Sequence, residues 1–334
     1  MAMTPREIVR RTVRFEGADR IPYYLPSEYG SDIYEVNMNP SPDVRPGTGV
    51  DEWGCVWENI GICCLGEVKE HPLKDWADWD RLPKPDIRDP RRWAGIENAR
   101  RAAGDKFLIG FGISLYERVH FLRGLENAWV DIIAAPGELE RLIDLLVEMN
   151  LYAIERYAHA GVDGLLFCDD WGLQNRFMIS PDSWRRIWKP RYARVYQAAH
   201  AAGLSTWLHS CGHITEVLDD LIECGLDVIQ MDQQENMGLE DLGERFGGRI
   251  TFWCPVDIQT VMVHGSLDEI RDYCGRLVRV LGRPNGGFIA KYYPDPVGAG
   301  HRPEAVQAMS EEFLRLCNAV CNSQKQIDGR PDNR

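Results

Sequence analysis

The sequence predicts a (β/α)8 TIM barrel of the α/β class, with an irregular or hairpin elaboration near its N-terminus. From residue 93 onward, short runs of β-forming residues alternate regularly with segments of helical periodicity. This alternation indicates a parallel sheet with crossover helices. Seven strands are expected, and a short eighth is placed within 50–70, a number that favours a barrel over an open sheet. No G-x-G-x-x-G follows a strand and no Walker sequence is present, so the main nucleotide-binding signatures are missing.

The N-terminal part begins with a helix over 4–16, because Thr4 suits the N-cap and Pro5 suits the first helical position. A strand over 21–25 follows and leads into a loop that carries Glu28.

Residues 37–92 are expected to be an elaboration on a single domain that spans 1–322. Their first part, 37–49, is rich in Pro, Asn and Gly, and 51–68 resembles a small hairpin. The polar tail 323–334 is expected to be disordered.

The regular part of the chain supplies the remaining elements. The expected strands are 107–112, 164–168, 206–211, 228–231, 250–253 and 287–292. The expected helices are 94–103, 114–134, 138–160, 180–202, 215–223, 239–246, 267–281 and 303–322. Ser180 suits an N-cap and Gly203 a helix stop, so the helix between them has signals at both ends.

Composition narrows the class of partner. The chain has 334 residues with a net charge of −13, which argues against nucleic acid or an anionic membrane as the main partner. No run of 18 apolar residues exists, and the first residues lack a hydrophobic signal core. The ten Cys form no regular framework and no C-x-x-C pair, so they are expected to be reduced thiols of a cytoplasmic protein.

The most informative stretch is 206–214, which contains His209 and Cys211 near the end of an expected strand. Alternate strand residues point to the same face, so the imidazole and the thiol are expected to project together, as two zinc ligands do. The alternative is a buried Cys beside a core His, since a free Cys packs as a small hydrophobe. The position where a strand meets its loop favours the functional interpretation, because that end carries the chemistry of parallel α/β folds.

Polar residues follow most of the other strands as well and are expected to share one pocket at the strand C-termini. Carboxylates come from three positions, Asp169, Asp170 and Glu28, which are the expected catalytic groups. The expected substrate-binding residues are Tyr29, Tyr116, Trp171, Gln174, Gln230, Asp232, Trp253 and Tyr292. For Asp169 and Asp170 an alternative stays open, namely that one of them caps the turn after its strand.

The chain resembles the uroporphyrinogen decarboxylase superfamily, including its corrinoid-dependent methyltransferases and its uncharacterised branch. The resemblance lies in 168–175 (CDDWGLQN), 178–182 (MISPD), 209–213 (HSCGH) and 286–289 (GGFI), with 51–57 and 72–76 in addition. Order and spacing match from about residue 4 to 320. The resemblance implies a (β/α)8 barrel with its cleft at the strand C-termini.

Two chemistries are implied by the resemblance. True uroporphyrinogen decarboxylases bind the acetate arms of their substrate with N-terminal arginines, whereas 24–30 has no Arg and one Glu, the wrong charge for that task. The methyltransferases hold zinc with H-x-C and a distant Cys after the last Gly-Gly strand. His209 and Cys211 match the first part, and Asp295 lies close to the position of the missing Cys, with Glu28 or Asp169 as a fourth ligand.

The main hypothesis is therefore a zinc-dependent methyltransferase that moves a methyl group between a small methylated compound or corrinoid protein and a thiol or pterin acceptor. Corrinoid or tetrahydrofolate is the implied methyl carrier, and a corrinoid carrier protein and a homodimer are the implied partners. The alternative is a metal-free decarboxylase or lyase that acts on a carboxylated small molecule. For that reaction the basic candidates are Arg118, Arg123, Arg176 and Lys291. A third hypothesis is a barrel without chemistry that binds a ligand or a carrier protein.

Overall fold

The computed structural model describes residues 2–44, 47–59 and 66–328. The chain divides into two compact units. Unit 1 consists of Met1–Tyr34, Ala103–Phe107 and Asp227–Arg334, and unit 2 consists of Glu35–Ala102 and Leu108–Leu226. The expected metal-binding pair and the residues around it belong to unit 2, whereas several expected substrate-binding residues belong to unit 1.

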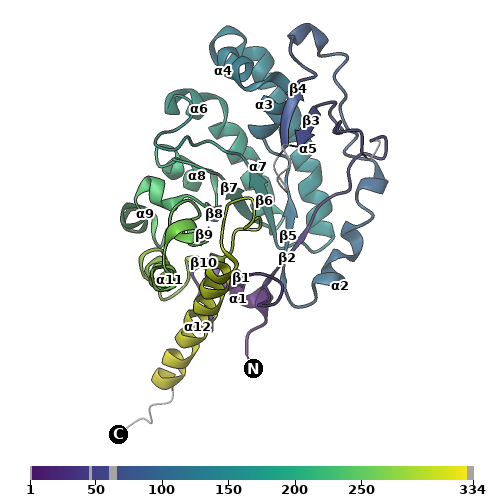
Figure 1. Ribbon diagram of the computed structural model, residues 1–334. Coiled ribbons are helices and arrows are strands. Elements are labelled where there is room, and N and C mark those ends of the chain that lie inside the picture. Colours follow the sequence, from purple (N-terminus) through teal and green to yellow (C-terminus); the bar gives the residue numbers. More distant parts are fainter. Residues whose placement is uncertain (1, 45–46, 60–65, 329–334) are drawn as a thin grey trace. The chain divides into compact units, whose positions relative to one another are not determined.

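In unit 1, four parallel strands lie in the order β1-β10-β9-β8 (Figure 1). They are β1 (Tyr23–Tyr24), β8 (Val228–Gln230), β9 (Thr251–Cys254) and β10 (Phe288–Lys291). Every residue of β8, β9 and β10 is buried, as is typical of parallel strands covered on both faces. The register pairs Tyr24 with Lys291 and Ala290 with Cys254.

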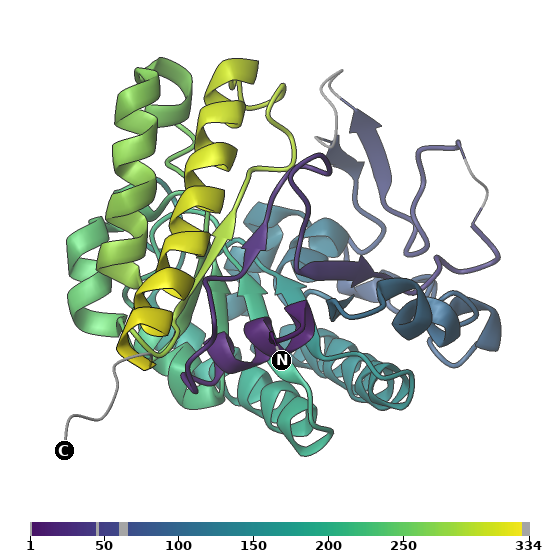
Figure 2. The same ribbon diagram turned by 90° about the horizontal axis from the view of Figure 1, so that it is seen from below.

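The helices of unit 1 begin at clear sequence signals. They are α1 (Pro5–Val13), α9 (Leu239–Phe246), α10 (Val261–His264), α11 (Leu267–Leu281) and α12 (Pro303–Asp328), with a 3-10 turn η4 (Gln234–Met237). Thr4 caps α1 by accepting a hydrogen bond from the backbone N–H of Glu7, and Ser266 with Glu269 forms a capping box for α11. Helices α11 and α12 pack side by side (Figure 2).

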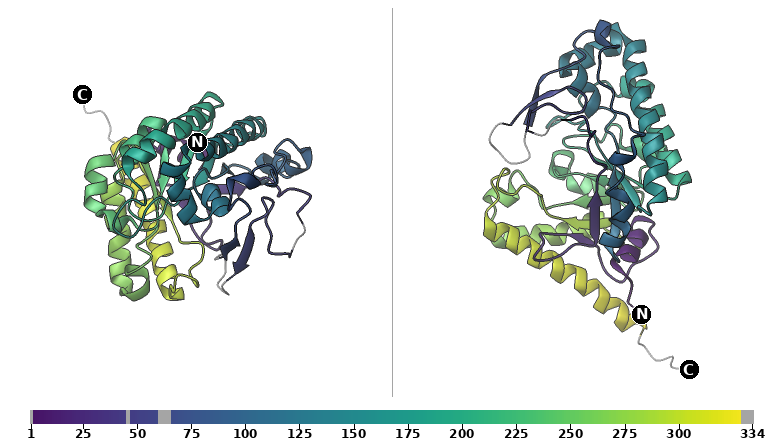
Figure 3. Two further views of the ribbon diagram at one scale, coloured as in Figure 1. Left: turned by 90° about the horizontal axis from the view of Figure 1, so that it is seen from above. Right: turned by 90° about the vertical axis from the view of Figure 1, so that its right-hand side faces the viewer.

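Unit 2 holds three parallel strands in the order β7-β6-β5. They are β5 (Phe107–Phe111), β6 (Gly164–Cys168) and β7 (Ser205–His209), and β2 (Ile33–Val36) stands next to β5 in the strand order. The helices are α2 (Ala99–Ala103), α3 (Glu117–Arg123), α4 (Leu125–Ala134), α5 (Pro136–His159), α6 (Pro181–Ile187), α7 (Lys189–Ala201) and α8 (Leu218–Cys224). Three 3-10 turns precede them, η1 (Trp76–Asp78), η2 (Pro90–Arg92) and η3 (Ile96–Asn98). The long helix α5, teal in Figure 3, packs against α7.

The eight strands β1, β2 and β5–β10 have the alternation with helices that characterises a (β/α)8 barrel, which confirms the predicted fold class. The hairpin expected over 51–68 is present as a separate antiparallel pair, β3 (Val56–Asn59) with β4 (Gly66–Glu70). The expectation that the eighth barrel strand lies within 50–70 is wrong. That strand is β2, a four-residue segment directly before the Pro-rich stretch and too short to show a period.

Two expected helices are each divided in two. The helix expected over 114–134 is interrupted at Gly124, whose φ of +83° is outside the helical region. The helix expected over 180–202 is interrupted at Trp188, because Pro190 has no N–H to donate and in a continuous helix its ring would clash with the carbonyl of Arg186. Among the described helices, none is both long enough and apolar enough to cross a membrane.

Candidate metal centre at the ends of two strands

The site begins where β6 and β7 end side by side. Their register pairs Cys168 with His209, and the backbone N–H of Asp169 donates a hydrogen bond of 3.0 Å to the carbonyl of His209. The strand expected over 206–211 thus ends at His209, and Cys211 lies in the loop that follows. Because the two strands end in register, Asp170 and Cys211 occupy equivalent positions, each two residues beyond its strand.

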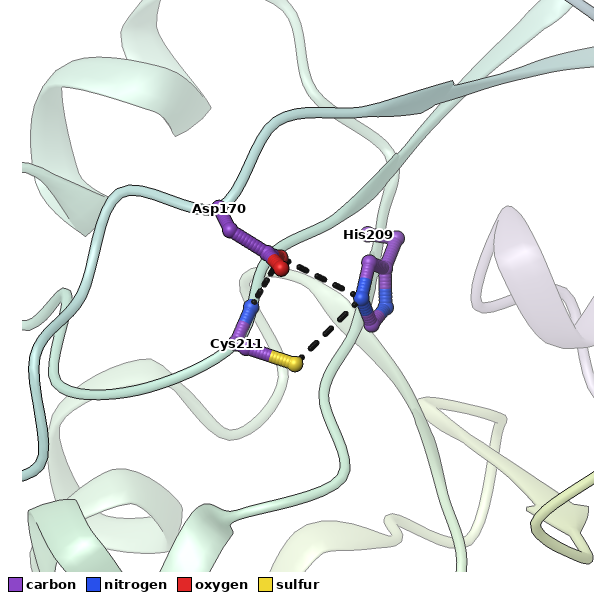
Figure 4. A group of neighbouring side chains, drawn as sticks. All are labelled: Asp170, His209 and Cys211. Carbon is purple, nitrogen blue, oxygen red and sulfur yellow. Dashed lines mark hydrogen bonds and ion pairs between the residues drawn. The ribbon is translucent and has the colours of Figure 1, made fainter. Parts of the chain in front are cut away.

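Three donor atoms of different kinds converge at this edge (Figure 4). Nε2 of His209 lies 3.3 Å from Oδ1 of Asp170 and 3.4 Å from Sγ of Cys211. The three ligand atoms lie within 4.8 Å of one another, and in the described part of the chain they form the one such group of His, Cys and acidic side chains. Nitrogen, sulfur and oxygen are the zinc donors of proteins, and three protein ligands leave a fourth position for a substrate.

The site is partly open to solvent. The side chain of His209 is 20% exposed and that of Asp170 is 41% exposed. Cys211 is half-buried as well, so none of the three side chains is sealed within the core.

Two glycines allow the loops after β6 and β7 to approach each other. The backbone N–H of Gly172 donates to the carbonyl of Cys211 at 3.1 Å, and that of His213 donates to the carbonyl of Leu173 at 2.8 Å. A Cβ at Gly172 would lie 2.2 Å from the nitrogen of His213, and one at Gly212 would lie 2.3 Å from the oxygen of Gly172. Gly212 also has a φ of +73°, so side chains are excluded from both positions.

The electrostatics of the site favour a positive charge between the three side chains. Burial alone would lower the pKa of His209, but hydrogen bonds with Asp170 and Cys211 outweigh it and raise that pKa well above its usual value. Burial alone would raise the pKa of Asp170, but the same contact with His209 holds it below its usual range. The carboxylate of Asp170 and the imidazole of His209 face each other in this arrangement. A metal cation could take the place of the proton between them.

Asp169 is fully buried and serves as an anchor for another loop. Its carboxylate accepts hydrogen bonds from the backbone N–H groups of Leu115, Tyr116 and Glu117 and from the hydroxyl of Tyr192. Burial raises the pKa of Asp169 to about 6, although these hydrogen bonds act in the opposite direction. The carboxylate thus holds the β5–α3 loop, and its expected catalytic role stays a prediction.

Tyr116 and Trp171 are buried and stack with their ring centroids 3.9 Å apart. Nε1 of Trp171 donates to the hydroxyl of Tyr192 at 2.9 Å, and the hydroxyl of Tyr116 donates to Sδ of Met178 at 2.8 Å. Because both rings are buried, they can affect substrate binding only indirectly, by supporting the residues that they contact. Gln174, also expected to bind substrate, is exposed.

In unit 1, several expected substrate-binding residues form a buried polar cluster. Asp232 accepts hydrogen bonds from Nε2 of Gln230 at 2.8 Å and from Nζ of Lys291 at 2.7 Å. The ammonium group of Lys291 lies 5.8 Å from the ring centroid of Trp253. Tyr292 belongs to the same unit, and its ring stacks on that of Tyr24 with centroids 5.7 Å apart.

The remaining expected site residues of unit 1 lie in loops. Glu28 is exposed and accepts from the hydroxyl of Ser27, whereas Tyr29 is half-buried. Asp295 accepts a hydrogen bond of 3.0 Å from the backbone N–H of Gly298. The roles of Glu28 as a catalytic group and of Asp295 as a metal ligand stay predictions.

The family model for uroporphyrinogen decarboxylase (URO-D) matches residues 66–313, which is more than half of the chain. The chain belongs to the uroporphyrinogen decarboxylase family. A uroporphyrinogen decarboxylase from Alkalilimnicola ehrlichii is 22% identical over 267 residues, which cover 74% of this chain and 70% of that protein. A methyltransferase from Methanosarcina mazei has the same fold, with a TM-score of 0.66 and 17% identity over 94% of this chain and 99% of its own.

One residue of this family member was missed by the sequence analysis. Glu117 accepts a hydrogen bond of 3.3 Å from the backbone N–H of Asp170, and its other oxygen lies 3.6 Å from Nε2 of His120. Burial, with the charges of Asp170 and Asp169, raises the pKa of Glu117 to about 8. Ser114 and Glu117 have the spacing of a capping box, which indicates a helix cap, but Asp169 takes the capping role from across the sheet.

Proposed function

We propose that this member of the uroporphyrinogen decarboxylase family is a zinc-dependent methyltransferase whose metal is held by Asp170, His209 and Cys211. The observation that carries the proposal is the convergence of these three donor atoms within 4.8 Å at the ends of two parallel strands. Asp170 supplies the oxygen ligand within unit 2. Asp295 as a ligand of the same metal stays a prediction outside this set.

Zinc bound there would supply Lewis acidity to a thiol, a pterin nitrogen or a leaving group. The protein's own residues would bind this zinc and orient its ligand atoms. His209 offers Nε2, Cys211 offers its sulfur as the thiolate, and Asp170 offers a carboxylate that the backbone N–H of Cys211 holds in place at 2.8 Å. Such support from neighbouring groups fixes the direction of each ligand.

The methyl group would pass between a small methylated compound or a corrinoid protein and a thiol or pterin acceptor, with corrinoid or tetrahydrofolate as carrier. Support for the methyltransferase class comes from the fold shared with the methyltransferase from Methanosarcina mazei over nearly the whole chain. The proposal places the reaction in the cytoplasm, because the ten Cys follow no disulfide framework.

The second candidate function is decarboxylation of a small carboxylic acid without a metal. The observation that favours it is the 22% identity to a uroporphyrinogen decarboxylase, whereas the buried ammonium of Lys291 is already paired with Asp232 at 2.7 Å. The two candidates differ in their need for the thiol, since decarboxylation does not require Cys211.

Metal analysis of protein purified without added zinc tests the proposal. We expect about one zinc per chain, and loss of most of it in His209→Ala and Cys211→Ser. Cys168→Ser is the matched control, because this thiol lies beside His209 in the sheet but outside the three-donor group. Metal content that is negligible in the wild type, or that stays unchanged in Cys211→Ser, overturns the proposal.

A further inference from the structure

Unit 2 contains a second feature, a cavity of about 360 Å³ beyond the end of β5. Its lining comes from segments that are far apart in sequence, namely residues of 37–44 and 51–53, Arg92, and residues of 112–118. The last of these segments is the loop that Asp169 anchors and that contains Glu117, whose carboxylate contacts the backbone of Asp170. The cavity and the metal centre therefore share one loop.

The lining contains two arginines, Arg92 and Arg118, which differ in how many of their N–H groups are bound by neighbouring residues. Arg92 is 2% exposed, and Glu52 binds its guanidinium with two hydrogen bonds of 2.7 and 2.9 Å. Glu52 also accepts from the backbone N–H of Ser41 at 2.7 Å. Within the described chain, Nε of Arg92 has no hydrogen-bond partner although it is buried.

Arg118 has more N–H donors available for a ligand than Arg92 has. Its side chain is 21% exposed, its Nη1 donates a hydrogen bond of 2.8 Å to Asp51, and its guanidinium also interacts with the thiol of Cys55. A guanidinium has five N–H donors, so the others can face a ligand. The rings of Trp53 and Phe121 lie 5.5 Å from its central carbon and restrict its movement.

The ion pair with Asp51 leaves part of the guanidinium of Arg118 available to a ligand. The aspartate carboxylate also accepts from the backbone N–H groups of Trp53 and Cys55 and from Nε1 of Trp57. The negative charge of Asp51 is thereby shared among four donors, which weakens its hold on any one of them.

We propose that this cavity binds the carboxylate group of a small organic acid and that Arg118 is its anchor. A guanidinium presents paired donors that match a carboxylate. The lining contains two arginines and two acids, Asp51 and Glu52, so a singly charged group fits better than a phosphate dianion. Met38, Pro40, Val44 and Ile113 supply apolar surface for the rest of the molecule.

The inference rests on the proposed function in one respect, because the acid bound in this cavity would be a substrate or acceptor for the neighbouring metal centre, with which the cavity shares a loop. A larger cavity of about 910 Å³ lies in unit 1 between residues of α10, α11 and α12. Its lining contains none of the expected site residues, and three of its four arginines, Arg271, Arg276 and Arg315, are bound to acidic neighbours. The fourth, Arg279, is exposed on α11.

Calorimetric titration of the full chain with benzoate, and with its neutral counterpart benzamide, tests the proposal. We expect saturable binding of benzoate with a Kd of about 1 mM, and binding of benzamide that is at least about tenfold weaker. Arg118→Gln should weaken benzoate binding at least about tenfold, whereas Arg81→Gln, an exposed arginine paired with Asp78, should leave it unchanged.

A second variant covers the case in which Arg118→Gln does not fold. Ser114→Met fills the cavity and leaves both arginines in place, and it should also weaken binding. His209→Ala should lose metal but still bind benzoate, so a failure of this proposal is distinct from a failure of the metal proposal. Absence of saturation at about 50 mM, equal binding of benzamide, or tighter binding of inorganic phosphate overturns the carboxylate site.

Discussion

The backbone N–H of Cys211 donates a hydrogen bond of 2.8 Å to Oδ1 of Asp170, so the loop after β7 holds the carboxylate that follows β6. The same oxygen lies 3.3 Å from Nε2 of His209. One contact thus fixes the distance between two proposed ligands that are 41 residues apart in sequence. Preorganisation of this kind lowers the cost of assembling a metal site.

Asp170→Asn should weaken metal binding while the fold is kept. An amide can still accept from the N–H of Cys211, but it is neutral and a poor zinc ligand. Loss of even an outer partner costs 10- to 100-fold in metal affinity, so loss of a direct ligand should raise the zinc Kd by about 100-fold or more. Competition with a chromophoric chelator measures this. Asp182→Asn, a side chain that is 92% exposed, is the control and should bind zinc like the wild type.

Gly212→Ala should destabilise the protein and remove the metal. Both the positive φ and the 2.3 Å approach to the oxygen of Gly172 act against a side chain. Gly203→Ala separates the two effects, because Gly203 has a φ of +82° with nothing within 4 Å of an added Cβ. We expect a loss of about 1–2 kcal/mol in unfolding free energy for Gly203→Ala and more than about 3 kcal/mol for Gly212→Ala, measured by urea unfolding. Equal losses of unfolding free energy in the two variants would show that the close approach of the two loops does not add to the cost of a side chain at Gly212.

Sequence reasoning singled out the His209–Cys211 pair because both side chains lie in one short stretch, although the strand ends at His209 and Cys211 lies in the loop. It weighed Asp170 as a proton acceptor and not as a ligand, since the neighbour of a loop residue depends on strand register. The register of Cys168 with His209 places Asp170 and Cys211 together, and single-strand patterns do not contain that information. The tight pairing of Gly172 with Gly212 depends on the same register.

Elsewhere in the fold, tertiary contacts decided features that the local sequence does not show. Glu117 was missed because nothing in the local sequence shows that Asp169, directly after β6, binds the backbone N–H groups of Tyr116 and Glu117. The barrel class itself was predictable because it follows from the alternation of strands and helices over 200 residues. β2 was missed because four residues give too short a pattern.

Tyr192→Phe should destabilise unit 2 through the anchor residue Asp169. The hydroxyl of Tyr192 donates to Asp169 at 2.7 Å and accepts from Nε1 of Trp171 at 2.9 Å, all within the core. Its removal leaves two buried polar groups with one partner fewer, which costs about 2 kcal/mol of unfolding free energy. Tyr152→Phe, whose ring packs on Trp93 at the half-buried surface of α5, should change stability by less than about 0.5 kcal/mol. A neutral result for Tyr192→Phe would contradict the anchoring role of Asp169.

The contact of Asp51 with Arg118 should make stability depend on pH in the acid range. Burial alone would raise the pKa of Asp51, but the charge and hydrogen bond of Arg118, with further hydrogen bonds from Cys55 and Trp57, hold it below its usual value. A carboxylate whose pKa is lower in the folded state stabilises the protein above its unfolded pKa of about 3.9, and this stabilisation is lost as the pH falls through the folded value.

Urea unfolding of the wild type and of Asp51→Asn over a pH series measures this contribution. The wild type should be more stable than the variant by a constant amount above about pH 5, and the difference should shrink below about pH 4 as Asp51 takes up its proton. Asp78→Asn serves as the control, because its partner Arg81 is exposed and surface ion pairs contribute little. A difference between wild type and Asp51→Asn that grows on acidification would have the wrong sign for a carboxylate with a lowered pKa, and Arg118 would then not be its stabilising partner.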